Sequence, residues 1–230
     1  MREVLRQNLA AIKKKIGQAV QKSGRDADEI KLIAVSKTHP VEVLQNAIAA
    51  GASIFGENKV REAEDKIDVL GKENLEWHLI GHLQSNKARK AVKLFDVIHT
   101  LDSIELAERL ERICIEENRA SLSVLIEVDL ANEATKNGVG EKDLPELVDF
   151  LRTCERLKFN GLMIIPPFFE DTEKVRPYFS RLRKIRDEII PNGALSMGMS
   201  HDFETAIEEG ATMVRVGTAI FGARENFNHR

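Results

Sequence analysis

Cysteine and aromatic residues are scarce in this chain, which has two cysteines, one tryptophan and one tyrosine among 230 residues. Cys114 and Cys154 fall in amphipathic helical stretches, which favours buried thiols over a disulfide framework. The N-terminus continues from Met1 as an amphipathic helix and lacks the apolar block of a signal peptide. No run of about 18 apolar residues is present to span a membrane. These absences favour the cytosol, where thiols stay reduced.

Positive charge is not in excess either, because 34 Lys and Arg residues stand against 37 Asp and Glu residues, a formal net charge of −3. Binding of a nucleic-acid backbone needs a basic surface, so nucleic acid is not expected as the main partner. His78 and His82 have the spacing of metal ligands on a helix. They straddle the end of an expected strand, however, where side chains at this spacing need not converge. We therefore expect no metal site.

A glycine-rich nucleotide-binding loop is missing where an open α/β sheet usually carries one. Eight short apolar runs, suited to buried parallel strands, alternate with helical patterns. They span residues 31–36, 53–56, 76–80, 96–99, 123–129, 159–164, 194–199 and 212–216. The first run leads into Ser36-Lys37-Thr38-His39-Pro40, without the glycines of a dinucleotide fold. Eight strands and no such loop predict a single (β/α)8 TIM barrel, one domain over residues 1–230.

An additional helix is expected before the first strand, at residues 3–22. Its apolar residues repeat at steps of three and four and form one stripe. They are Leu5, Leu9, Ile12, Ile16 and Ala19. Only nine residues follow Phe221, too few for a full outer helix after the last strand. The N-terminal helix is therefore expected to fill part of that gap.

Lys37 is the first candidate for chemistry, because it directly follows the apolar residues 32–35. In an α/β barrel the active site lies at the C-terminal ends of the strands, so this lysine should project into the barrel mouth. Apolar surroundings lower the pKa of a lysine, and a neutral amine can form an imine with an aldehyde. Position alone is equally compatible with a solvated lysine at the start of a loop.

Small residues end the seventh and eighth strands, where α/β barrels commonly bind phosphate. Ser200 can cap a helix beginning at His201, and Gly217 and Thr218 offer close backbone approach, N–H groups and a hydroxyl. Ser200 alone would be read as a plain helix cap; the two strand ends together favour a phosphate site. A lysine and a phosphate site at one mouth suit pyridoxal phosphate. An aldolase that binds a sugar phosphate is the competing interpretation.

The motifs along the chain resemble those of the pyridoxal-phosphate homeostasis protein family. They are Ala34-Val35-Ser36-Lys37-Thr38, Phe55-Gly56-Glu57-Asn58, His78-Leu79-Ile80-Gly81-His82-Leu83-Gln84-Ser85-Asn86-Lys87, Gly161-Leu162-Met163, Ser196-Met197-Gly198-Met199-Ser200 and Val214-Arg215-Val216-Gly217-Thr218-Ala219-Ile220-Phe221-Gly222. They run through the whole chain in the family's order. Members of this family resemble the barrel domain of bacterial alanine racemase.

The resemblance implies a role for six residues in binding pyridoxal 5′-phosphate. Lys37 matches the Schiff-base lysine and Arg215 the arginine that faces the pyridine nitrogen. The matched phosphate contacts are Ser200, Gly217 and Thr218, and Asn58 matches a polar residue of the pocket. No role is carried over to His201, and the sequence does not decide whether His82 or His99 faces the mouth.

Two functions remain open at this point, a carrier of pyridoxal phosphate and an amino-acid racemase. Racemisation needs acid–base groups on both faces of the substrate carbon, and in alanine racemase a tyrosine of the partner subunit's β domain acts opposite the lysine. This chain ends at Arg230, and its one tyrosine, Tyr178, lies on the apolar stripe of a helix. The missing second base favours the carrier, with no catalytic residue. The resemblance implies the same, with a part in vitamin B6 homeostasis and pyridoxal-phosphate-dependent apo-enzymes as partners.

Overall fold

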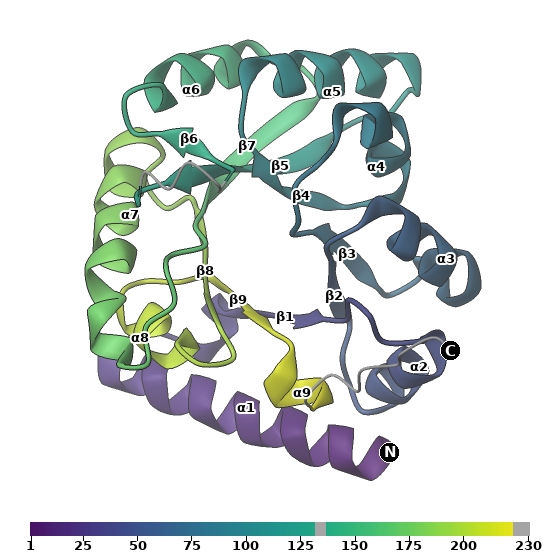
Figure 1. Cartoon of the computed structure of the whole chain (residues 1–230), viewed down its shortest axis with the longest axis vertical. Helices are drawn as coiled ribbons and strands as arrows, with labels where there is room; N and C mark the ends of the chain where they lie inside the picture. The colour runs from purple at the N-terminus through teal and green to yellow at the C-terminus, as the bar shows by residue number, and fades with distance from the viewer. Residues whose placement is uncertain (132–136, 223–230) are drawn as a thin grey trace.

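The protein forms a closed barrel of parallel strands surrounded by helices (Figure 1). A computed structural model describes residues 1–131 and 137–222. Within these residues the eight strands of the barrel are β1 (Lys31–Val35), β2 (Ile54–Glu57), β3 (Glu76–Leu79), β4 (Val97–Leu101), β5 (Leu122–Asp129), β7 (Leu157–Met163), β8 (Ala194–Met199) and β9 (Met213–Val216). Neighbours in this order pair in parallel, and β1 pairs with β9 to close the circle. The predicted (β/α)8 barrel is confirmed.

Each predicted strand is present, with ends within two residues of the expected ones. Two ends differ by two residues: β4 continues to Leu101, and β7 starts at Leu157, where it pairs with Leu122 at the start of β5. A two-residue strand, β6 (Val139–Gly140), was not predicted. It pairs with the end of β5 outside the barrel circle (Figure 1). Hydrogen-bond pairing with neighbouring strands sets these strand ends, and the sequence pattern alone does not show which residues pair.

Helices cover the outside of the barrel (Figure 1). They are α1 (Arg2–Ser23), α2 (Val41–Ala49), α3 (Val60–Leu70), α4 (Ala88–Leu94), α5 (Ile104–Glu116), α6 (Leu144–Thr153), α7 (Arg176–Ile189), α8 (Phe203–Glu208) and α9 (Thr218–Phe221). Short 3₁₀ turns lie at Ala27–Glu29, Ser85–Lys87 and Thr172–Lys174. Among the described residues, no helix is long and apolar enough to cross a membrane.

Among the described residues, the last strand is followed by the four-residue helix α9, and the N-terminal helix α1 packs beside it. Its predicted apolar stripe is buried, and the helix packs on α8 and α9. Asn8 on α1 donates a 2.8 Å hydrogen bond to the carbonyl of Ile220 in α9. The helix therefore packs against the short helix that follows β9, in the gap where the sequence indicated it.

Strand alternation divides the apolar residues into two clusters. The larger cluster lies between the strands and the helices, and it contains Phe55 and the fully buried Trp77. The smaller cluster lies inside the barrel and consists of Ile33, Val97, Leu125, Met163 and Met213. In a strand, successive side chains point to opposite faces, so residues two apart from these also face the interior. The barrel is thus filled with side chains and has polar groups above the inner apolar cluster.

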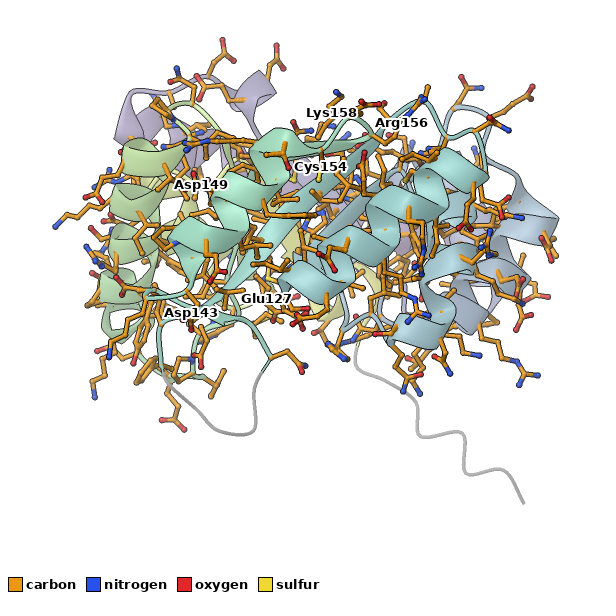
Figure 2. The ribbon with its side chains drawn as sticks, turned by 90° about the horizontal axis from the view of Figure 1, so that it is seen from above. Glu127, Asp143, Asp149, Cys154, Arg156 and Lys158 are labelled. Atoms are coloured by element: carbon orange, nitrogen blue, oxygen red, sulfur yellow. The ribbon has the colours of Figure 1, made fainter. Side chains whose placement is uncertain are left out.

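The side view distinguishes the two ends of the barrel. In Figure 2, Glu127 near the end of β5 lies toward one end, whereas Arg156 and Lys158 at the start of β7 lie toward the other. All barrel strands run parallel, so every strand ends on the Glu127 side. We call that end the mouth.

Candidate functional site

A cavity of about 300 Å³ opens at the mouth of the barrel. All six residues that the sequence singled out line it, namely Lys37, Asn58, Ser200, Arg215, Gly217 and Thr218. They come from the ends of four different strands and the loops that follow. The remaining lining residues are Val35, His39, Ile80, Ile165, Phe168, Met199, His201 and Gly222. The barrel therefore brings together side chains that lie up to 181 positions apart in the chain, from Lys37 to Thr218.

Lys37 reaches the cavity from the turn that follows β1. Ile33 belongs to the inner apolar cluster, and Val35 and Lys37 follow at steps of two. The same alternation points Ile33 and Val35 into the barrel, and Lys37 follows in the turn after β1. Val35 lines the cavity beside the half-buried Lys37, so the lysine stem lies against apolar surface. Lys37 is therefore part of the cavity wall at the mouth.

A buried ion pair supports the Lys37 segment from behind the sheet. Ser36 donates a 2.6 Å hydrogen bond to the Glu57 carboxylate, and Lys66 of α3 donates to the same oxygen at 2.6 Å. Lys66 also donates to the carbonyl of Ser36 at 2.8 Å. Burial raises the pKa of the Glu57 carboxyl, and the nearby Lys66 charge acts against that rise. The backbone just before Lys37 is thereby tied to both β2 and α3.

The backbone just after Lys37 is tied to α3 as well. Thr38 has a φ of 69°, an unusual conformation for a residue with a branched side chain. Its N–H donates to the carboxylate of Glu62, which also accepts a 2.7 Å hydrogen bond from Lys66. Such a conformation persists only where surrounding contacts hold it. We define Ser36, Glu57, Glu62 and Lys66 as the support cluster, because it fixes the chain on both sides of Lys37.

The ends of β8 and β9 meet at another wall of the cavity, beside the end of β1. The Ser200 hydroxyl accepts hydrogen bonds from the backbone N–H groups of Gly217 at 3.1 Å and of Ala219 at 3.4 Å. Thr218 lies between these two N–H groups and is exposed. Two donors and two hydroxyls therefore converge at one small place. This arrangement has the chemistry of an anion site.

The prediction that Ser200 caps a helix starting at His201 is wrong. Helix α8 starts two residues later, at Phe203, and its N-cap residue is Asp202. The Asp202 carboxylate accepts a 2.7 Å hydrogen bond from the N–H of Met199 instead. Ser200 lies in the preceding turn, where its hydroxyl meets the end of β9.

Gly198 permits this turn at the end of β8. It has a φ of 90°, and a Cβ there would lie 2.6 Å from the Cβ of Ala206 and 2.9 Å from the Cα of Phe203. Only glycine accommodates both the backbone conformation and the close approach of α8. The end of the strand therefore bends against the helix and presents Ser200 to the cavity.

Arg215 forms the floor of the cavity and is almost fully buried. Its guanidinium donates to the Ser196 carbonyl at 2.8 Å, to the Ser196 hydroxyl at 2.6 Å and to the Ile164 carbonyl at 2.8 Å. Burial lowers the pKa of Arg215 to about 10, and the charges of Glu127 and Asp202 act in the opposite direction. The group is still a cation at neutral pH, held in one orientation by its three acceptors.

Asn58 reaches the cavity from the end of β2, where the chain passes very close to Gly81. A Cβ on Gly81 would lie 2.5 Å from the carbonyl oxygen of Asn58 and 2.8 Å from its Cα. Contacts this short do not occur in real proteins, so position 81 must be glycine for the two loops to pass. The Gly81 carbonyl also accepts a 2.9 Å hydrogen bond from Thr100.

The three histidines whose roles the sequence left open lie in different environments. His201 lines the cavity, and its ring nitrogen Nε2 lies 2.9 Å from the Glu170 carbonyl. His99 is fully buried inside the barrel, 2.9 Å from the Ser196 hydroxyl. His82 lies 3.1 Å from Asp102 at the mouth and, in the described part of the chain, is not among the residues that line the cavity.

Metal binding finds no support in these positions. His78 contacts His99 and Glu76, whereas His82 contacts Asp102, so the two histidines at helical spacing have separate partners. Across residues 1–131 and 137–222, no group of three or more His, Cys, Asp and Glu side chains could hold a metal ion. The absence of a metal site stays a prediction.

Glu127 is a residue that the sequence reasoning missed. It lies near the mouth end of β5 (Figure 2), and its side chain is buried. Burial and the negative charge of Asp102 raise the pKa of Glu127 to about 7, with Arg215 acting against the rise. A signal was present, because Glu127 is the one charged residue among the otherwise apolar positions 124–128 of an interior strand. Strand alternation from Leu125 points it into the barrel.

The arrangement suits a small molecule that carries a carbonyl group and an anionic group. The Lys37 amine offers a nucleophile for a carbonyl group. The N–H and hydroxyl groups at the ends of β8 and β9 can hold an anion, and the Arg215 cation lies between the two walls. The volume of about 300 Å³ lies at the lower end of the range for small-molecule pockets. The residues present thus fit a compact, anionic carbonyl compound.

Comparison with known proteins places the chain in a family. Residues 7–225 match the family "Alanine racemase, N-terminal domain". The pyridoxal phosphate homeostasis protein of Aquifex aeolicus is 42% identical over 226 residues, covering 95% of this chain and 98% of that protein. The protein of the same name from Escherichia coli K12 is 42% identical over 231 residues, covering 95% and 96% of the two chains.

A solved structure agrees with these relatives. PipY of Synechococcus elongatus PCC7942, with pyridoxal phosphate bound, is 37% identical and matches with a TM-score of 0.80. The match covers 95% of this chain and all of that one. The chain belongs to the alanine racemase N-terminal domain family and, within it, to the pyridoxal phosphate homeostasis proteins.

Proposed function

We propose that this protein binds pyridoxal 5′-phosphate as a Schiff base on Lys37 and acts as a cofactor carrier in vitamin B6 homeostasis, without substantial turnover of amino acids. The observation that carries the proposal is the convergence of Lys37, Arg215 and the β8 and β9 ends on one cavity. Pyridoxal phosphate would supply an aldehyde that condenses with an amine. It has the carbonyl group and the anionic group that the cavity suits, and its ring nitrogen would face Arg215.

The phosphate is assigned to the ends of β8 and β9. Ser200, Gly217 and Thr218 supply two hydroxyls and backbone N–H groups there. The N–H groups of Gly217 and Ala219 already point at an oxygen, that of Ser200. Hydrogen bonds to a charged acceptor are worth about 1.5–3 kcal/mol each, so this part of the ligand should provide much of the affinity.

The pyridine ring is assigned to the space between Lys37 and Arg215, with Asn58 at its side. A protonated arginine cannot accept a proton from its neighbour, so Arg215 favours a neutral ring nitrogen. A neutral ring withdraws electrons less strongly from a bound amino acid. This weakens the ligand as a catalyst and leaves it well suited to storage and transfer.

Racemisation would need a second acid–base group facing Lys37. Tyr178 lies in α7, packed against the outer core with its ring centroid 6.0 Å from that of Phe169. Two histidines do line the cavity, and both have partners. The His39 ring stacks on Phe221 at 4.8 Å, and the His201 ring contacts the Glu170 carbonyl. We therefore assign no catalytic residue, and we propose that pyridoxal-phosphate-dependent apo-enzymes in the cytosol receive the cofactor.

The test of the Schiff base is borohydride reduction of the protein loaded with pyridoxal phosphate, followed by peptide mapping. The pyridoxyl group is expected on Lys37, and Lys37→Ala should lose the visible imine band while staying folded. Lys59→Ala is the matched control, because Lys59 is an exposed lysine directly after Asn58 at the same end of the barrel. A reduced adduct on another lysine would refute the assignment.

The test of the carrier function is incubation of the loaded protein with L- and D-amino acids and chiral analysis of the products. Amines should shift the imine band by exchange with Lys37, without sustained product formation. Losing one acid–base group costs about 10²–10⁴-fold in rate. A turnover number near the enzyme median of about 10 s⁻¹, abolished by Lys37→Ala, would establish a racemase or related enzyme instead.

A further inference from the structure

A chain of polar side chains crosses the inside of the barrel below the cavity. From Arg215, it continues through the Ser196 hydroxyl at 2.6 Å to His99 at 2.9 Å from that hydroxyl. His99 Nε2 lies 2.7 Å from Nδ1 of His78, and His78 Nε2 lies 2.9 Å from Oε1 of Glu76. We call Ser196, His99, His78 and Glu76 the interior chain.

The interior chain connects the two ends of the barrel. Glu76 is the first residue of β3 and lies at the end opposite the mouth, where it also accepts a 2.9 Å hydrogen bond from Lys31, the first residue of β1. His78, His99 and Ser196 are fully buried. The contacts therefore form one line from a partly exposed carboxylate at one end to the cavity floor at the other.

With a single hydrogen on each ring, the two ends fix the direction of every hydrogen bond in the line. An arginine only donates and a carboxylate only accepts. Burial lowers the pKa of His99 well below its usual value, and hydrogen bonding to His78 is the largest of the influences that lower the pKa of Glu76 to about 2. Glu76 is thus an ion and His99 is neutral at pH 7.

The proton positions follow from these constraints. Ser196 receives a hydrogen bond from Arg215, so its own hydrogen is available for Nδ1 of His99. His99 then carries its hydrogen on Nε2 and donates it to Nδ1 of His78. His78 in turn carries its hydrogen on Nε2 and donates to Glu76. In this arrangement each ring carries its single hydrogen on Nε2, and all donors point away from the cavity.

We propose that the interior chain positions Arg215 for the bound ring, with Glu76 as its fixed acceptor at the far end of the barrel. This role rests on the proposed function, because Arg215 is the residue assigned to the pyridine ring. Replacing Glu76 with an apolar residue removes the acceptor that orients His78. The reversed order, with hydrogens on the Nδ1 atoms, then becomes available, and it would turn Ser196 from a donor to His99 into its acceptor.

Histidine NMR of the ligand-free protein tests the chain directly. In the wild type at pH 7, the ¹⁵N shifts of His78 and His99 should be those of neutral rings with hydrogen on Nε2, assigned with His78→Gln and His99→Gln. Glu76→Leu should shift both rings toward a mixture of the two tautomers. Glu76→Gln retains an acceptor oxygen and should restore the wild-type pattern. Glu73→Gln, which removes an exposed carboxylate three residues earlier, should change neither ring.

Affinity measurements test the positioning of Arg215. Pyridoxal phosphate should bind Glu76→Leu roughly fivefold to tenfold more weakly than the wild type, a loss about equal to the contribution of one hydrogen bond. It should bind Glu76→Gln as tightly as the wild type. Inorganic phosphate should compete equally well with all three proteins, because its contacts lie at the ends of β8 and β9.

Two results would overturn the inference. One is a wild-type His99 that is protonated or carries its hydrogen on Nδ1. The other is a folded Glu76→Leu variant with unchanged histidine shifts and unchanged affinity. Failure of the wild type to bind pyridoxal phosphate would contradict the proposed function instead. The NMR of the ligand-free protein would still show whether the interior chain has the proposed proton positions.

Discussion

Lys66 donates a 2.8 Å hydrogen bond to the backbone carbonyl of Ser36, so a buried cation behind the sheet holds the residue that precedes Lys37. The same ammonium group pairs with the buried Glu57 carboxylate at 2.6 Å. Charges are costly to bury unless they are paired. Burying the charges of the support cluster therefore costs free energy, and the contacts within the cluster offset that cost. The cluster lies next to the proposed Schiff-base lysine.

Lys66→Met should destabilise the protein by about 3–5 kcal/mol, because it leaves the Glu57 carboxylate buried without a cation. Replacing Glu57 as well, in Lys66→Met/Glu57→Gln, should recover much of that loss, since a neutral amide needs no counter-charge. Urea unfolding of the two single variants and the double variant measures the coupling. Lys90→Met, which removes an exposed ion pair with Glu64, is the control and should cost no more than about 1 kcal/mol. Additive effects of Lys66→Met and Glu57→Gln would contradict the pairing.

Glu127→Gln should change the pH dependence of stability. The pKa of Glu127 is about 7 in the folded protein against 4.5 for an ordinary glutamate. Between these values the folded state keeps a proton that the unfolded state releases, so the free energy of unfolding falls as pH rises from about 4.5 to about 7. Glu127→Gln has no carboxyl to titrate, so its free energy of unfolding should not fall in this way. Relative to the wild type, its free energy of unfolding should rise by up to about 3 kcal/mol over that window.

Urea unfolding at pH 5 and pH 8 measures the effect of Glu127→Gln. Glu108→Gln removes an exposed carboxyl of α5 and should keep the same difference from the wild type at both pH values. A Glu127→Gln difference that stays constant between pH 5 and pH 8 would mean that the Glu127 carboxyl is already ionised in the folded protein at pH 5.

Ser200→Ala should weaken the binding of pyridoxal phosphate about 10- to 100-fold, the range of one hydrogen bond to a charged group. Binding of pyridoxal, which has no phosphate, should change little. Fluorescence or absorbance titration with both compounds separates the two effects. The control is Ser103→Ala, which removes the side-chain cap of α5 and leaves the cavity untouched. Equal losses for the two compounds would mean that Ser200 does not contact the phosphate.

Gly81→Ala should destabilise the protein by about 1–3 kcal/mol, since its Cβ would lie 2.5 Å from the backbone oxygen of Asn58. Movement of Asn58 should also weaken the binding of pyridoxal phosphate. Gly17→Ala in α1 is the matched control, because a Cβ there meets no atom within 4 Å. It should stabilise the helix by about 0.5–1 kcal/mol. Denaturation and ligand titration of both variants check the pair, and equal effects would exclude a steric role for Gly81.

Local pattern was enough to predict the barrel and the place of Lys37. Strand alternation depends only on neighbouring residues, so the register of Ile33 and Val35 can be read along β1, and Lys37 follows in the turn after the strand. The same holds for the small residues that end β8 and β9, since barrels of this class bind ligands at strand ends. The six site residues therefore lie on one cavity as expected, although their roles stay proposals.

Contacts between distant parts of the chain came only from the closed barrel. Ser196 and His99 lie 97 residues apart and meet at 2.9 Å because β4 and β8 face each other across the barrel interior. Lys66 lies behind Ser36 because α3 packs over β2 and β1. Ser200 bonds to the end of β9 and not to its own helix, which corrected the predicted cap. Such contacts depend on how far each strand is shifted against its neighbours when the barrel closes, and no local pattern in the sequence encodes that shift.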